Sequence, residues 1–217
     1  MMKTTLKGKY ESIKNSVTAS LTVDTNLGDL KLKTSVADVA AAYASLPSSL
    51  SFTLEKPRSF SIDYTPEKDD VKFKFMNSVK VMEKAVDLTY THTRGENRTE
   101  VEGAVALDAG NKIAVSNVLG TEEWKVRYTY AHGALRRTVI EPSYDVKANA
   151  WDFAVTRKFE HGQAVKATFR SSSKAFDLEW TGDIPYNTTI KISGSINMTE
   201  KIAAPKLTAE STWIYEI

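Results

Sequence analysis

The residues whose types could take part in acid–base or metal chemistry are three histidines and one pair of carboxylates. Glu100 and Glu102 are two residues apart, so in a strand both leave the same face, where they could perform acid–base chemistry. A hydrated wall or surface also accounts for this pair. His92, His132 and His161 lie in or beside separate turn sequences, without the spacing of metal ligands. Nucleotide-binding and nucleophile motifs are absent, and so is cysteine. We therefore predict neither enzyme activity nor a cofactor or metal.

A second chemical pattern is a set of charged residues that recur at alternate positions. Because successive strand side chains point to opposite faces, these residues share one face of a sheet. If that face surrounds water, its basic early part and mixed later part would form a wide, weakly selective passage that attracts small anions. The predicted pore-lining residues are Lys7, Lys9, Lys31, Lys33, Lys72, Lys74, Lys80, Asp87, Glu100, Glu102, Lys125, Arg127, Asp152, Lys166, Arg170, Asp177, Glu179, Lys191 and Glu210.

The charges must be positioned by strands, and strands are indicated by an alternation of apolar and polar residues with a period of two. This alternation runs from one end of the chain to the other. Turn sequences such as Arg94-Gly95-Glu96-Asn97 separate the segments, many of which approach the ~9–11 residues of a tilted membrane strand. We predict one all-β domain over residues 1–217, an antiparallel transmembrane β-barrel with a polar, charged lumen. An even strand number of about 12 to 16 is expected, with about 14 as the central value.

Two segments fit the alternation poorly. Residues 37–49 are rich in alanine and contain Pro47, so a short helix and a loop both remain open there. Pro142 interrupts the segment after Val139. Proline in a sheet is confined to edges, ends or bulges, so this segment is predicted to be irregular.

Alternation alone does not decide whether the apolar face points inward or outward. A soluble barrel or sandwich turns it inward, and a membrane barrel turns it outward to lipid. Three features favour the membrane: a strand number too large for side chains to fill the barrel, a densely ionic opposite face, and aromatic residues near the ends of apolar runs. The aromatic residues are Tyr10, Tyr64, Tyr90, Tyr130, Trp180 and Tyr215. The alternative, a soluble β-barrel or sandwich that binds a small apolar ligand, stays open.

Composition excludes several classes. The chain has 217 residues, 41% hydrophobic and 26% charged, and a net charge of +2, which is too small to predict nucleic-acid binding. No stretch approaches the ~18 apolar residues of a membrane helix. The first ten residues lack the apolar core of a secretory signal. We therefore expect an organelle outer membrane rather than the bacterial export route.

Several strings resemble the plant chloroplast outer envelope pore protein 24 family. They include Lys7-Gly8-Lys9-Tyr10-Glu11, Lys72-Phe73-Lys74-Phe75-Met76-Asn77, Arg94-Gly95-Glu96-Asn97-Arg98-Thr99, Trp151-Asp152-Phe153-Ala154-Val155 and Ala209-Glu210-Ser211-Thr212-Trp213. The resemblance runs along the whole chain. It implies a weakly selective, high-conductance channel in the plastid outer membrane, similar in behaviour to mitochondrial porin. Implied solutes are phosphorylated sugars, phosphate, dicarboxylates, amino acids and nucleotides.

The resemblance assigns no binding residue to a position in this chain. The expected partners are membrane lipids and small anionic and zwitterionic metabolites. No nucleic-acid partner is expected, and a homo-oligomer remains open.

Overall fold

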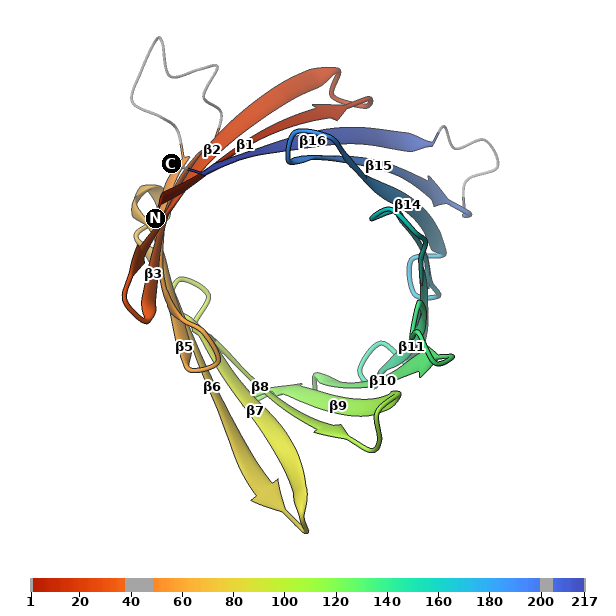
Figure 1. Ribbon diagram of the computed structural model, residues 1–217. Helices are drawn as coiled ribbons and strands as arrows, with labels where there is room; N and C mark the ends of the chain where they lie inside the picture. Colours follow the sequence, from red (N-terminus) through yellow and green to blue (C-terminus); the bar gives the residue numbers. More distant parts are fainter. Residues whose placement is uncertain (1, 38–48, 200–204, 217) are drawn as a thin grey trace.

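The computed structural model describes residues 2–37, 49–199 and 205–216 as a closed antiparallel barrel (Figure 1). The described part contains sixteen strands. They are β1 (Met2–Glu11), β2 (Ser16–Leu27), β3 (Leu30–Ala37), β4 (Ser49–Lys56), β5 (Phe60–Thr65), β6 (Asp70–Val81), β7 (Lys84–Thr93), β8 (Arg98–Ala106), β9 (Asn111–Val118), β10 (Trp124–His132), β11 (Thr138–Asp145), β12 (Ala150–Lys158), β13 (Ala164–Arg170), β14 (Ala175–Ile184), β15 (Thr188–Asn197) and β16 (Lys206–Glu216). A short 3₁₀ turn, η2 (Pro66–Lys68), joins β5 to β6. None of the helical turns in the described residues is long and apolar enough to cross a membrane.

The all-β prediction is confirmed, but the central value of fourteen strands is wrong. Very short turns separate some neighbouring strands, so the boundary between two such strands leaves little signal in the sequence. Met82 and Glu83 alone connect β6 to β7, and both have positive φ angles of 47° and 66°. A two-residue turn of this kind matches the twist of the flanking strands, so no longer loop is needed.

Every strand pairs with its neighbours in sequence, and β1 pairs with β16 to close the sheet. The closing pair keeps one register from Lys3 opposite Glu216 to Glu11 opposite Thr208. Closure leaves the sheet without an unpaired outer strand, which an open sheet of this size would have.

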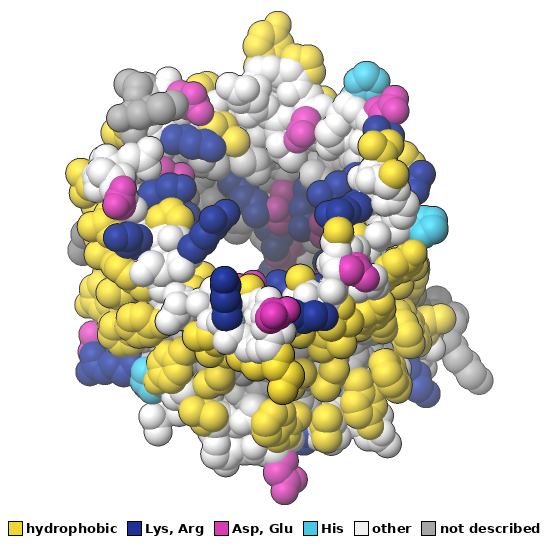
Figure 2. Space-filling model, turned by 60° about the horizontal axis from the view of Figure 1, so that its bottom comes forward, with side chains coloured by type: hydrophobic (Ala, Val, Ile, Leu, Met, Phe, Trp, Pro, Cys, Tyr) yellow, Lys and Arg dark blue, Asp and Glu magenta, His cyan; other side chains and the backbone are white. Residues whose placement is uncertain are grey.

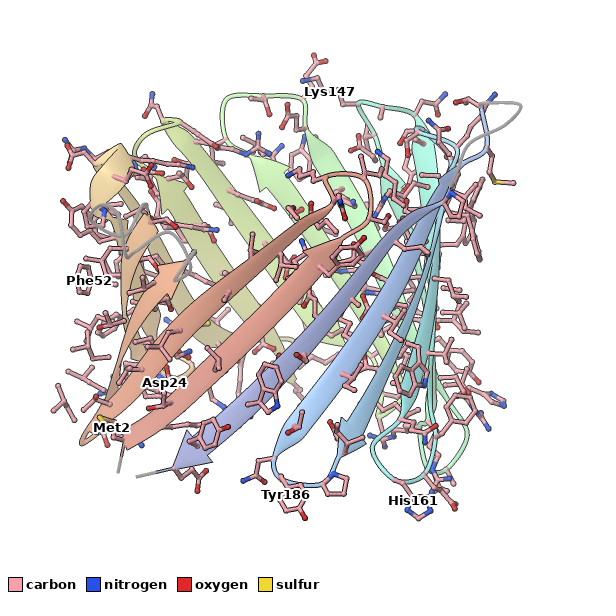
Figure 3. The ribbon with its side chains drawn as sticks, turned by 90° about the horizontal axis from the view of Figure 1, so that it is seen from above. Met2, Asp24, Phe52, Lys147, His161 and Tyr186 are labelled. Carbon is pink, nitrogen blue, oxygen red and sulfur yellow. The ribbon has the colours of Figure 1, made fainter. Side chains whose placement is uncertain are left out.

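The barrel has two distinct ends (Figure 3). Met2, His161 and Tyr186 lie at the end that carries both chain termini, here called the terminal end. Lys147 lies at the opposite end, here called the loop end, together with the β9–β10 and β11–β12 connections. Phe52, on β4, lies at the outer side of the wall between these two ends.

The β6–β7 hairpin extends away from the ring of strands (Figure 1). β6 pairs with β5 only from Asp70 to Phe75, whereas its residues 77–81 pair with β7 alone. The side chain of Asn77 accepts a hydrogen bond of 2.8 Å from the backbone N–H of Ser78, which satisfies one donor of this half-open segment. The tip residue Met82 is 94% exposed. The last part of β6 therefore lies beyond the point where β5 encloses the barrel.

Pro142 lies inside β11, a strand paired on both sides, and not at an edge. Its pairing with β12 is continuous, with Pro142 opposite Phe153. On the β10 side the paired positions run from Arg127–Ser143 directly to Tyr130–Ile140. Proline has no N–H to donate, so the ladder is interrupted on that side alone. The irregularity predicted for this segment is thus local. The ambiguity over residues 37–49 falls almost wholly on residues 38–48, which lie outside the described residues.

Candidate functional site

The cross-strand register places the predicted lining residues on a single face of the sheet. Lys9 on β1 faces Glu210 on β16, and Lys191 on β15 faces the same Glu210. Asp152 on β12 likewise lies directly opposite Arg170 on β13. Charged residues on neighbouring strands therefore share one face of the sheet. Figure 2 shows that the hollow of the barrel is bordered by Lys, Arg, Asp and Glu side chains, whereas the outside is covered by apolar ones. A role for these side chains in conduction stays a prediction.

Lys80 differs from the other members of this set. It has the phase of the inner face, but it pairs only with Ala85 across the β6–β7 hairpin, past the end of β5. Asp87, opposite Ser78, still borders an inner cavity of about 610 Å³ with Glu102 and Lys112. The structure therefore brings the predicted residues together around the hollow, with Lys80 set apart at the terminal end.

The opposite face of the sheet is apolar and exposed. Val155 is 41% exposed and Ile192 is 48% exposed, although both lie near the middle of strands that are paired on both sides. Among the described residues, the buried apolar side chains are only Ala104, Ala114, Val118 and Ala150. A soluble barrel of this size would bury its large apolar residues in a dry centre. The described residues form no such centre for an apolar ligand.

Aromatic residues on the outer face gather toward the strand ends. Tyr10 and Tyr64 are the penultimate residues of β1 and β5 at the loop end, and Tyr215 is the penultimate residue of β16 at the terminal end. Tyr144 and Trp151 pack with their ring centroids 4.9 Å apart at the loop end. Tyr90 and Trp180, which belong to the same predicted set, lie deeper within β7 and β14. Aromatic belts of this kind mark the two water interfaces of membrane barrels.

Charged side chains on β8 to β16 and on β1 form ion pairs along the inner face. Each pair joins a basic residue to a carboxylate on its own strand or on a nearby strand, mostly at direct contact distance. The pairs are Arg127–Glu102 at 2.7 Å, Lys125–Asp152 at 3.7 Å, Arg170–Asp177 at 2.8 Å, Lys191–Glu179 at 2.7 Å, Lys7–Glu210 at 2.6 Å and Lys9–Glu11 at 2.5 Å. This part of the wall, here called the paired wall, is thus largely neutralised within itself.

Lysines on β3 and β6 are less completely paired. The Nζ atom of Lys33 donates to Glu55 on β4 at 2.9 Å. Lys31, Lys72 and Lys74 form no ion pair in the described part of the chain, although Lys31 lies directly opposite Glu55 and Lys72 opposite Asp63. On the inner face from β2 to β6, lysines outnumber carboxylates: the lysines include Lys31, Lys33, Lys72 and Lys74, and the carboxylates include Asp24, Glu55 and Asp63.

Several inner-face charges were missing from the predicted set. They include Asp24, Glu55, Asp63, Lys112 and Glu141. Their phase relative to neighbouring apolar residues could have identified them, as with Glu55, one residue from the outward Leu54. Asp24 has a buried carboxylate oxygen without a hydrogen-bond partner among the described residues.

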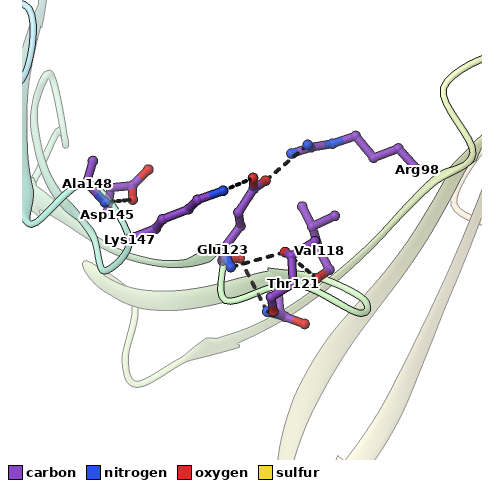
Figure 4. A network of polar contacts seen from close by, with 8 residues as sticks. Arg98, Val118, Thr121, Glu123, Asp145, Lys147 and Ala148 are labelled. Carbon is purple, nitrogen blue, oxygen red and sulfur yellow. Dashed lines mark hydrogen bonds and ion pairs between the residues drawn. The ribbon is translucent and has the colours of Figure 1, made fainter.

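A rim network at the loop end joins the β9–β10 and β11–β12 connections to the first residue of β8 (Figure 4). Glu123, between β9 and β10, accepts a hydrogen bond of 2.7 Å from Lys147 and pairs with Arg98 at 3.0 Å. The hydrogen bond from Lys147 and the charges of Lys147 and Arg98 hold the pKa of Glu123 below its usual value. The network ties the β9–β10 connection to its two neighbours.

At the terminal end, Asp108 shapes the turn between β8 and β9. Its carboxylate accepts hydrogen bonds from the backbone N–H of Gly110 at 2.7 Å and from the Asn111 side chain. These bonds lower the pKa of Asp108.

Glu102, His92 and His132 each have a polar partner in the structure. Glu102 is paired with Arg127, and the described residues contain no group of three side chains that could hold a metal ion. The Nδ1 atom of His92 lies 2.9 Å from the Thr99 hydroxyl, and that of His132 lies 3.1 Å from the Tyr130 hydroxyl.

A closed barrel that is apolar outside and charged inside defines the class of porin-like β-barrel proteins. Solved structures agree on the fold: a triple mutant of the porin from Rhodopseudomonas blastica superposes with a TM-score of 0.59, covering 99% of both chains at 6% identity. The family model described as Outer envelope pore protein 24 matches residues 2–216. The chain therefore belongs to the outer envelope pore protein 24 family.

Curated relatives cover the full length. The chain is 43% identical over 224 residues to "Outer envelope pore protein 24, chloroplastic" of Oryza sativa subsp. indica, covering all of both chains. It is 41% identical over 216 residues to "Outer envelope pore protein 24B, chloroplastic" of Arabidopsis thaliana, covering all of this chain and 99% of the relative. The family and the fold are those of channel proteins and not of enzymes.

Proposed function

We propose that this protein is a passive, weakly selective diffusion pore in the plastid outer envelope. The observation that carries the proposal is the arrangement of the two faces of one closed sheet. Apolar side chains such as Ile192 cover the outside, and charged ones such as Lys191 on the same strand face the hollow. A membrane-spanning barrel needs this arrangement, because lipid contacts one face and water the other.

The proposed solutes are small charged metabolites, including phosphorylated sugars, phosphate, dicarboxylates, amino acids and nucleotides. A lumen that carries many charges of both signs stays hydrated, and it lacks the single-sign ring that would give sharp selectivity. The basic excess on β3 and β6 would favour anions modestly. The described strands close around the hollow within a single chain, which supports conduction by one copy.

Conductance across a planar bilayer tests this proposal. Purified, refolded protein should produce discrete, long-lived current steps in KCl and a reversal potential close to zero in a salt gradient. It should also need detergent or lipid to remain monodisperse. A protein that stays monodisperse in plain buffer and gives no current would contradict the proposal.

A further inference from the structure

Two neighbouring rows of inner-face residues cross β3, β4, β5 and β6. The first row runs Lys31, Glu55, Ser61 and Lys74 in direct cross-strand register. The second row runs Lys33, Thr53, Asp63 and Lys72. Each row therefore has a lysine at both of its ends. We refer to these eight residues as the lysine strip.

The carboxylates inside the lysine strip are already engaged. Glu55 accepts a hydrogen bond from Lys33, and Asp63 accepts one of 2.6 Å from the Thr53 hydroxyl. Asp24 borders the strip on β2, where it faces Lys33 on one side and Lys3 on the other. Lys31, Lys72 and Lys74 thus keep ammonium groups that form no ion pair within the described residues. The strip contains four lysines but only two carboxylates, Glu55 and Asp63, so its net charge is positive.

The spacing of these three lysines fits a ligand with several negative charges. Lys72 and Lys74 are two residues apart on one strand, so their Cα atoms are about 7 Å apart. Lys31 and Lys74 are three strands apart, which corresponds to about 14 Å. Flexible lysine side chains can converge over such a span. A single phosphate group would contact one or two ammonium groups, whereas a chain of phosphates could contact all three.

We propose that the lysine strip is a luminal binding site for compounds that carry more than one phosphate group, and that an occupied site slows the passage of smaller ions. This inference rests on the proposed pore function. Glu55, Asp63 and Asp24 limit the affinity, because they oppose an anion at short range. A site that binds weakly lets the ligand leave again, as transport requires.

The paired wall does not offer an equivalent site. Several of its cations contact carboxylates, as in the pairs Lys191–Glu179 and Arg170–Asp177. Its remaining strand lysines without an ion pair among the described residues, such as Lys112, Lys158 and Lys166, lie one to a strand on β9, β12 and β13. An anion that binds there must displace a carboxylate that stays nearby and repels it. Location on the lysine strip, rather than total lumen charge, should therefore decide whether a phosphate chain binds.

Block of single-channel current by inorganic tripolyphosphate tests this inference. Recording in about 0.1 M KCl keeps the screening length near 10 Å, so the lysines still act over the strip. Wild-type channels should show a concentration-dependent reduction of current, and orthophosphate should need about a tenfold higher concentration for the same effect. Exchange of Lys72→Gln together with Lys74→Gln should raise the blocking concentration about tenfold.

The matched control is the exchange of Lys112→Gln together with Lys158→Gln. It removes the same charge from the inner faces of β9 and β12, away from the lysine strip. Its block should stay like that of wild type. Equal weakening in both variants would overturn the site, since a diffuse field would then explain the block. Normal KCl conductance without any block in wild type would also overturn the site but leave the pore intact. Absence of KCl conductance would instead reject the pore itself.

Discussion

The Nζ atom of Lys7 on the first strand lies 2.6 Å from Oε2 of Glu210 on the last strand. This ion pair crosses the seam at which the barrel closes, next to the direct register of Lys9 with Glu210. The Lys7 side chain is about half exposed to the lumen, so water weakens the attraction. The backbone ladder between β1 and β16, rather than this ion pair, is therefore expected to hold the seam.

Exchange of Glu210→Gln should consequently leave the barrel closed. We expect the free energy of unfolding to fall by less than about 1 kcal/mol, which is typical of a solvent-exposed pair. Urea unfolding of the protein in lipid vesicles, followed by tryptophan fluorescence, measures this change. A loss of several kcal/mol would show that the ion pair, and not the strand pairing, holds the seam.

The effect of a lysine of β6 on ion selectivity should depend on where the lysine lies along the strand. Exchange of Lys72→Glu together with Lys74→Glu should move the reversal potential in a KCl gradient toward cation preference. Lys80→Glu should have a much smaller effect, because Lys80 lies on the hairpin segment beyond β5. An unchanged reversal potential in the double variant would show that Lys72 and Lys74 do not border the conducting path.

A charge on the outer face should impair membrane insertion according to its depth. Ile192→Lys, near the middle of β15, should cost about 2–4 kcal/mol. The adjacent Ser193→Lys is the control, since it points to the opposite face of the same strand and should cost far less. Folded yield into vesicles, measured by the heat-dependent shift in gel mobility, reports the difference. Equal yields for the two variants would contradict the assignment of the faces.

The rim network should respond to acid. Because Lys147 and Arg98 lower the pKa of Glu123 in the folded protein, the contribution of Glu123 is fully present above about pH 4.3, the ordinary glutamate value. It is lost as the pH falls through the lower, folded pKa. The chain has no cysteine, so a spin label at Leu119→Cys would report on the β9–β10 connection alone.

Label mobility at this site should rise only at pH values below the ordinary glutamate range. In the background of Glu123→Gln, mobility should be raised already at pH 7 and should change little with acid. A label whose mobility follows the same pH curve in both backgrounds would show that Glu123 does not order this connection.

The alternation of side chains was sufficient to predict the strands and which residues share a face, and the ionic face and large strand number then favoured a membrane barrel. Residues such as Phe73 and Lys74 differ only in that phase, whereas Ile214, which is apolar but lies opposite Thr5 on the charged face, departs from it. The exact strand number was not predictable, because two-residue turns such as Met82–Glu83 leave little signal between adjacent strands. The depth of a residue in the membrane was not predictable either. Val105 stands inside an alternating apolar run of the sequence, yet it is the penultimate residue of β8.

The pairing of charges could not be read from the sequence. Lys72 and Lys191 have the same residue type and the same phase, yet only Lys191 contacts a carboxylate, at 2.7 Å. That difference depends on which strands become neighbours and in which register. The sequence predicted a basic early part and a mixed later part of the lining, but not which charges contact one another in the paired wall and which form the lysine strip.

The accessibility of single cysteines along β15 tests the central claim most directly. In vesicles, a membrane-impermeant methanethiosulfonate reagent should react with cysteines at Lys191, Ser193 and Ser195, which face the hollow. It should not react at Ile190, Ile192 and Ile196, which face lipid. Alternation with this phase is the predicted result. Reaction at Ile192 with protection at Ser193 would contradict the account, because the apolar face would then lie against water.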